Sequence, residues 1–161
     1  MGEIAPKRVA LMSIRPEFAH AILAGTKTVE FRKRPVAVDV THVLVYATMP
    51  VGLVLGWFSV QDQSTKSPKD LWKQFGRVGG IAKDRFFAYY DQRTMGTGII
   101  VGEVGLFADP LPLTELGQIM RPPQSFQYLT DIQIRRFVEA ASLPSHEGDW
   151  EPTGPKARTA A

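Results

Sequence analysis

The sequence predicts an α+β domain from three observations. Short apolar runs typical of strands come first, helical periodicity fills the middle, and a strand-like run returns before a last helix. At 161 residues the chain has the length of one ordinary domain and can bury a core without metal or disulfide support. We expect a folded domain over residues 1–141. Residues 142–161 hold Pro, Gly and charge with few hydrophobic residues besides Trp150, which predicts a flexible tail.

The first predicted elements are a strand, a helix and a second strand. Residues 9–14 form a short apolar run that ends at Arg15-Pro16, and Pro16 suits the first position of a helix, where its missing N–H costs nothing. Apolar residues recur at helical spacing up to Gly25, a residue that commonly ends helices. Residues 28–32 then alternate polar and apolar side chains, which indicates an extended strand that we expect over residues 28–34.

Two more strands and two helices follow. Residues 42–48 and 52–60 are strand-like runs joined by a turn at Met49-Pro50. Ser67-Pro68 is typical of a helix start, and the glycines at 79 and 80 separate that helix from a second one over residues 82–91. Aromatic residues gather on these helices. Those of the second helix are Phe86, Phe87 and Tyr90. Because they recur at helical spacing, we interpret them as core residues rather than as groups that stack on bases.

The remaining elements complete the α+β pattern. Residues 98–107 return to a strand, in which we interpret Glu103 as a charge that reaches solvent rather than as a catalytic group. Thr114 begins a short helix, and residues 121–126 form a stiff proline-rich connection. Thr130 and Gln133 have the spacing of a capping box at the start of a last helix.

Charge is concentrated near the N-terminus. The chain has a net charge of +3, but residues 1–36 alone contain seven Lys or Arg against three Glu, the local basic excess expected of a surface that meets phosphates. The chain has no Cys, which excludes disulfides, thiol nucleophiles and cysteine-ligated zinc, and its three His are scattered. We therefore expect no metal and no organic cofactor. No apolar run is long enough for a bilayer and no signal-peptide pattern is present, so we expect a cytoplasmic protein without a membrane partner.

The segment from Gly25 to Arg34 is the strongest candidate for a site. Alternation along a strand places Thr28, Glu30, Arg32 and Arg34 on one face, while the apolar side chains between them anchor the other. A carboxylate then lies beside two guanidinium groups. The same pattern also suits an edge strand whose solvated charges discourage edge pairing, so the motif by itself leaves both interpretations open.

The chain resembles the ASCH (activating signal cointegrator homology) domain family. The match to the family signature G-x-K-x-x-E-x-R is complete at Gly25, Lys27, Glu30 and Arg32. Further agreement runs in order along residues 8–129, and resembles the longer bacterial and phage members. It comprises Ser13-Ile14-Arg15-Pro16, Val45-Tyr46-Ala47, Gly56-Trp57-Phe58, Ser67-Pro68, Leu71-Trp72 and Arg121-Pro122-Pro123-Gln124-Ser125-Phe126.

The resemblance implies a PUA-like fold, a small and mostly antiparallel β-barrel with surrounding helices. It also implies a cleft beside the first helix and the motif strand that takes RNA or a nucleoside or nucleotide ligand. Our first hypothesis is therefore an RNA- or nucleotide-binding protein, with regulation, for example of transcription, as one use. The binding residues we expect are Ser13, Arg15, Lys27, Glu30, Arg32, Arg34, Tyr46, Gln124 and Ser125. In this hypothesis the four cations contact phosphates, and Glu30 or Tyr46 reads a base or stacks on it.

A second hypothesis is a small hydrolase that acts on a modified nucleoside or on RNA, with Lys27 and Glu30 as catalytic residues. One branch of the family is a 4-acetylcytidine amidohydrolase whose catalytic lysine falls at Lys27 and whose threonine nucleophile falls at Glu30. The carboxylate here disfavours that route, because its attack on an amide would give a reactive anhydride. A buried Lys27 beside Glu30 could still transfer protons. The competing interpretation is a structural ion pair of Glu30 with Lys27 or Arg32.

A third hypothesis is a protein-interaction module that uses the predicted tail and the aromatic helix. It depends on Phe86, Phe87 and Tyr90 being exposed, whereas burial of these side chains would count against it.

Overall fold

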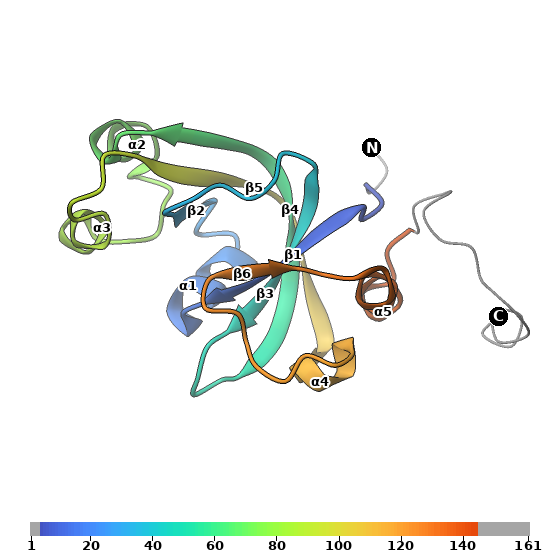
Figure 1. Cartoon of the computed structure of the whole chain (residues 1–161). Coiled ribbons are helices and arrows are strands. Elements are labelled where there is room, and N and C mark those ends of the chain that lie inside the picture. The colour runs from blue at the N-terminus through green and yellow to red at the C-terminus, as the bar shows by residue number, and fades with distance from the viewer. Residues whose placement is uncertain (1–3, 145–161) are drawn as a thin grey trace, which may run out of the picture.

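The computed structural model describes residues 4–144, which form one curved six-stranded sheet with helices around it (Figure 1). The sheet has the strand order β2-β5-β4-β3-β1-β6. The β1–β3 pair is parallel and the other four pairs are antiparallel, so the predicted α+β class with a mostly antiparallel sheet is confirmed. The sheet curves into a half-barrel. Its strands are β1 (Arg8–Ile14), β2 (Val29–Arg32), β3 (Val40–Ala47), β4 (Leu53–Lys66), β5 (Gly96–Leu111) and β6 (Phe126–Tyr128).

Strand β1 lies between β3 and β6 in the sheet, and packed residues cover both of its faces. Val9 and Leu11 pack into one hydrophobic cluster, while Ala10, Met12 and Ile14 pack into a second cluster on the opposite face. A strand covered on both sides needs apolar residues at every position rather than alternation. This explains why the first strand reads as a continuous apolar run.

Helix α1 (Pro16–Leu23) connects β1 to the motif strand β2. Pro16 occupies the start of the helix as predicted, and Gly25 follows its end with φ of 84°, a left-handed conformation that suits glycine. Ala19, Ile22 and Leu23 are its buried residues and join the second cluster. The helix therefore fixes where the chain re-enters the sheet at β2.

The long β4–β5 hairpin carries helices α2 (Pro68–Phe75) and α3 (Lys83–Tyr89) at its far end (Figure 1). Both strands are longer than predicted because the polar residues 62–66 pair with residues 96–100. Phe86 and Tyr90 are buried in a third cluster with residues of β2 and α2, and Phe87 is 36% exposed. The core interpretation is thus confirmed for two of the three aromatics, which weakens the interaction-module hypothesis. Glu103 is exposed, as expected.

The C-terminal part comprises α4 (Leu113–Leu116), β6 and α5 (Asp131–Ala141). The predicted capping box is present at Thr130 and Gln133. Leu143, which the sequence analysis placed in the tail, is 8% exposed and packs in the first cluster, so the folded part reaches at least this residue. Residues 145–161, including Trp150, lie outside the described residues. Among residues 4–144, no helix is both long and apolar enough to cross a membrane.

Candidate functional site

A cleft of about 1060 Å³ opens where α1, β2, α3 and the loop before β6 meet. Seven of its lining side chains are Lys or Arg and one, Glu30, is acidic, a local excess of six positive charges in a chain whose net charge is only +3. Low-dielectric walls of one charge sign focus the field within a cleft. Lys27, Glu30 and Arg32 of the GxKxxExR segment are among its lining residues and are largely buried.

Glu30 is held between two cations. Its Oε1 lies 3.5 Å from Lys27 Nζ, and its Oε2 lies 3.1 Å from Arg32 Nη1. The side chains of Lys27, Glu30 and Arg32 are 2%, 6% and 12% exposed. Both carboxylate oxygens are therefore engaged in a nearly water-free ion triad, the kind of arrangement in which a buried charge is tolerated. The ion-pair interpretation of Glu30 is the one that this geometry favours.

Lys27 ties the cleft floor to the loop between α2 and α3. Its Nζ donates to the carbonyl of Gly79, and Gly80, with φ of 62°, lies so close that a Cβ there would be 2.9 Å from Lys27 Cβ. Burial lowers the pKa of Lys27 below its ordinary value, while the charge of Glu30 acts in the opposite direction. Because its ammonium is enclosed, Lys27 does not contact phosphates at the surface as the first hypothesis expected.

Arg32 fastens the loop before β6 to the sheet. Its Nη2 donates to the Ser125 hydroxyl at 2.7 Å and to the Ser125 carbonyl at 3.3 Å, and its Nη1 donates to the Ser13 carbonyl at 3.3 Å. Within residues 4–144, Arg32 Nε is the one buried side-chain donor or acceptor that has no hydrogen-bond partner. Arg32 thus positions the loop and keeps one donor unsatisfied at the cleft floor.

Ser13, Gln124 and Ser125 also line the cleft, but the hydroxyls of both serines are engaged in hydrogen bonds within the protein. The Ser13 hydroxyl donates to the Pro123 carbonyl at 2.7 Å, and the Ser125 hydroxyl accepts from Arg32. These two hydroxyls hold the loop in place. Gln124 lines the cleft and is exposed, so it is the loop side chain open to a ligand.

Arg15 and Arg34 are the predicted phosphate-binding residues that lie open at the cleft. Both are exposed and line it, and neither forms one of the ion pairs found within residues 4–144. They stand on different elements, Arg15 just before α1 and Arg34 just after β2. Their charges are therefore available to an anion from two sides.

Tyr46 does not belong to the cleft. It is 5% exposed and packs with Leu44 and Trp57 in the first hydrophobic cluster, whereas Val43 and Val45 face the second cluster beside α1. The expectation that Tyr46 stacks on a base was wrong, because alternation along β3 turns its side chain toward the face covered by α4 and α5. A strand that is apolar on both faces gave no sign of which face would meet the cleft.

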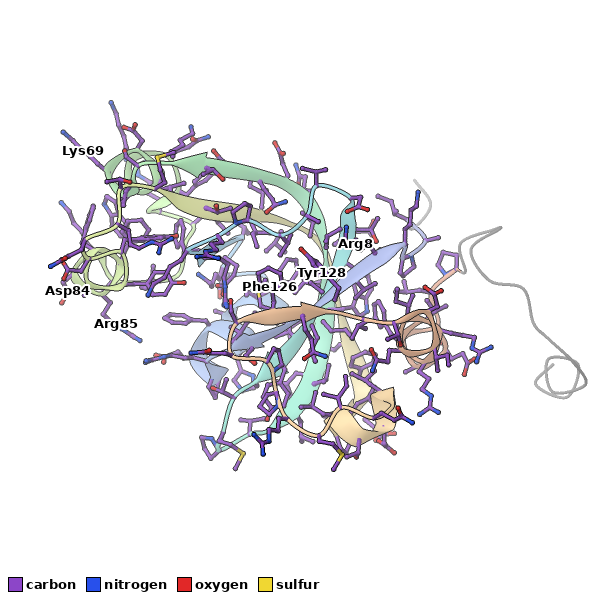
Figure 2. All side chains as sticks on the ribbon, viewed as in Figure 1. Arg8, Lys69, Asp84, Arg85, Phe126 and Tyr128 are labelled. Carbon is purple, nitrogen blue, oxygen red and sulfur yellow. The ribbon has the colours of Figure 1, made fainter. Side chains whose placement is uncertain are left out.

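Three cleft residues on and after α3 were missed by the sequence analysis: Arg85, Tyr89 and Arg93. Arg85 and Tyr89 are four residues apart and therefore share one side of α3, and Arg93 follows in the segment after the helix end. Arg85 leaves α3 on the side of α1 (Figure 2), where its Nη1 lies 3.2 Å from Glu17 Oε2. The fourfold spacing was the available signal, but the aromatic core residues next to it concealed it.

The cleft lining contains one carboxylate, Glu30, and is otherwise rich in guanidinium groups and aromatic rings. Among residues 4–144, no group of three or more His, Asp or Glu side chains is placed to hold an ion. The cleft instead offers guanidinium groups, an amide and aromatic rings. Guanidinium groups bind phosphates through paired N–H donors, and aromatic rings stack on nucleobases.

Comparison with known proteins gives several matches. The ASCH domain family model matches residues 12–96. The chain is 30% identical over 146 residues to an ASCH domain-containing ribonuclease of Zymomonas mobilis, covering 88% of this chain and 98% of that protein. The crystal structure of ASCH from Zymomonas mobilis superposes with a TM-score of 0.77 at 28% identity, covering 84% of this chain and 96% of that one.

A further relative is the large ribosomal subunit protein uL22 of Ureaplasma parvum serovar 3, which is 27% identical over 120 residues. That match covers 74% of this chain but only 38% of the ribosomal protein. The family model matches, the alignment covers nearly all of the bacterial relative, and the PUA-like fold is shared. These findings agree with the presence of the signature residues in this chain. The chain belongs to the ASCH domain family.

Proposed function

We propose that the protein binds RNA, or a nucleotide ligand, in the cleft built on the GxKxxExR segment. The observation that carries this proposal is the basic cleft itself, in which Arg15 and Arg34 are open around a buried triad. Exposed arginines supply the phosphate attraction that dominates sequence-independent binding of nucleic acids. The relative named as a ribonuclease supports RNA as the ligand class.

Single-stranded RNA fits this cleft better than a duplex does. Bases of a single strand are free to stack on side chains and to form hydrogen bonds through their edges, whereas those of an A-form duplex are not. The cleft is lined by Phe18, Tyr89 and Phe126 together with its arginines. This mixture of charge and rings is the composition of single-strand binding sites.

The binding test is the affinity of a short fluorescent single-stranded RNA, measured by anisotropy at increasing salt. We expect binding at low salt, with log K falling linearly against log salt by about 0.7 for each phosphate neutralised. A matched duplex should bind more weakly. Absence of binding at low salt, or an affinity independent of salt, would rule the proposal out.

RNA hydrolysis at the same cleft is a second candidate function. The relative's name favours it, and the lowered pKa of Lys27 is the kind of perturbation that catalytic groups show. In the first step of such cleavage a base removes the proton of the ribose 2′-hydroxyl, and the 2′-oxygen attacks the adjacent phosphorus to form a 2′,3′-cyclic phosphate. The 5′-oxygen leaves with a proton from an acid, and water can then open the cyclic phosphate. Lys27 and Glu30 are the candidates, although both are engaged in the triad.

The hydrolase test is incubation of labelled RNA with the wild type, Lys27→Ala and Glu30→Gln. Cleavage that disappears in both variants while RNA binding persists would support catalysis by the pair. Cleavage that continues in Lys27→Ala would remove Lys27 from any catalytic role. Parallel incubation with 4-acetylcytidine tests the amidohydrolase alternative, for which we expect no turnover because a carboxylate stands in place of threonine.

A further inference from the structure

Helix α3 presents two opposite faces. Phe86 and Tyr90 are buried against β2 and α2, whereas Arg85 and Tyr89 line the cleft, and Arg93, in the segment after the helix end, lines the same cleft. Residues four apart on a helix are separated by about 6 Å along its axis. This is the scale of one nucleotide step in an extended strand, so Arg85 and Tyr89 present a cation and a ring at nucleotide spacing, and Arg93 adds a second cation to the same cleft.

Tyr89 is fixed in position yet open to the cleft. Its ring meets the Tyr90 ring edge-on with centroids 4.8 Å apart, and Tyr90 is anchored by a 2.7 Å hydrogen bond from its hydroxyl to the Arg32 carbonyl. Tyr89 nevertheless stays 37% exposed. The Lys33 ammonium lies over its ring, 5.0 Å from the centre, in a cation–π contact that a base stacking on this face would have to displace.

Both arginines have contacts that a phosphate would have to replace or share. Arg85 pairs with Glu17 at 3.2 Å, and both side chains are about half exposed. Arg93 donates from Nη2 to the Lys33 carbonyl at 3.1 Å, which leaves its other donors available. An exposed ion pair contributes little, so a phosphate can displace Glu17 at small cost.

From this geometry we infer that α3 forms a subsite for one nucleotide step of single-stranded RNA, in which Tyr89 stacks on a base while Arg85 and Arg93 bind the flanking phosphates. The inference rests on the proposed RNA binding and names the form of the ligand. The cleft volume of about 1060 Å³ is at the upper end of the roughly 300–1000 Å³ typical of small-ligand pockets. A cleft of this size suits an oligonucleotide rather than a free nucleoside.

The test compares Tyr89→Leu with Phe87→Leu, a matched control on the same helix. Phe87 is exposed to the same extent, 36%, but does not line the cleft. With a labelled oligouridylate at low salt, Tyr89→Leu should weaken binding by about fivefold or more, since stacking of one base is worth about that much or more. Tyr89→Phe should retain binding, and Phe87→Leu should stay close to the wild type.

An oligouridylate with one abasic position provides a readout that misfolding cannot imitate. The wild type should bind it more weakly than the intact strand, and the difference should disappear in Tyr89→Leu. For the phosphates, Arg85→Ala should lower the salt slope by about 0.7, whereas Lys69→Ala on α2 should leave it unchanged. Lys69 projects away from α1 and β6 (Figure 2) and does not line the cleft.

The Glu17→Gln change should affect RNA affinity in the opposite direction. Because it frees Arg85 and removes a carboxylate from the cleft mouth, it should raise RNA affinity by about two- to fivefold, within the range of an exposed ion pair. If the wild type binds oligouridylate but Tyr89→Leu binds as tightly as Phe87→Leu, the subsite is overturned and the proposed function stands. If the wild type does not bind at low salt, the proposed function itself fails.

Discussion

Glu30, a residue of the family signature, has a structural role in this protein. The carboxylate balances two cations in a nearly water-free position, and the cations in turn bind Gly79 on one side and Ser125 on the other. Strand β2, the loop between α2 and α3, and the loop before β6 are thus linked through one buried carboxylate. The signature residues build the floor of the cleft, while more exposed arginines face the ligand.

Replacing Glu30 by Gln should lower the free energy of unfolding by about 3 kcal/mol, because it leaves two buried cations without their counter-charge. Lys27→Met should cost less, since Glu30 keeps Arg32. The two changes should be strongly non-additive in a double-mutant cycle measured by urea unfolding. Wild-type stability in Glu30→Gln would contradict the structural role and point instead to catalysis.

The buried side chain of His42 should make the stability of the protein depend on pH. It is 1% exposed, its ring lies near Trp57 and Phe137, and burial lowers its pKa to about 4. Because the unfolded chain takes up this proton near pH 6.5, the stabilising contribution of neutral His42 is complete above that pH. It is lost as the pH falls toward 4, by about 3 kcal/mol.

Urea unfolding between pH 4 and 7 checks this contribution. His42→Phe should flatten the decline, whereas replacement of the exposed His20 by Gln should leave it in place. An equal pH dependence in wild type and His42→Phe would assign the decline to other groups.

At the scale of elements, the loop at residues 121–125 owes its position to two side chains of the sheet. Ser13 donates to Pro123, and Arg32 donates twice to Ser125. Lysine at position 32 would keep the charge but lose the planar fork that makes these paired contacts. The loop should then open more often.

Hydrogen exchange of the segment 121–128 measures this opening. Arg32→Lys should raise the exchange rate of this segment. It should also raise that of the Ser13 amide, which donates to the Ser125 carbonyl at 3.0 Å. Arg121→Lys, an exposed change in the same loop, should have no such effect. Equal exchange in both variants would show that the loop is held by other contacts.

The elements that local signals determine were predictable from sequence. Pro16, Gly25, Ser67 and Thr130 mark helix ends by backbone chemistry that needs no knowledge of the rest of the fold. Which face of an element meets the cleft was not predictable in the same way. Tyr46 lies on a strand that is apolar on both faces, and only the positions of α1, α4 and α5 decide where its ring points.

The ion triad of Lys27, Glu30 and Arg32 was also only partly predictable from the sequence. Alternation correctly placed Glu30 and Arg32 together, but the burial of Lys27 depends on Gly79 and Gly80, some fifty residues later in the chain. On α3, the aromatic residues indicated a core without showing that Tyr89, unlike Phe86 and Tyr90, stays at the surface. Long-range packing thus decides which residues of a correct motif a ligand can reach.

At the scale of the whole molecule, the charge distribution is the central feature. The cleft carries an excess of six positive charges while the chain carries three, so the remaining surface is net negative. Such an arrangement draws an anionic chain to one site and repels it elsewhere. The account therefore claims that RNA binding depends on where the positive charges lie, not on their total.

Two double charge reversals with the same net charge test this claim most directly. One replaces Arg15 and Arg34 at the cleft by Glu, and the other replaces the exposed Lys69 and Lys73 of α2. We predict that the cleft reversal weakens binding of single-stranded RNA by about tenfold or more, at roughly 1 kcal/mol per charge contact, whereas the α2 reversal changes it by less than about threefold. Equal losses in the two variants, or a larger loss from α2, would contradict the account.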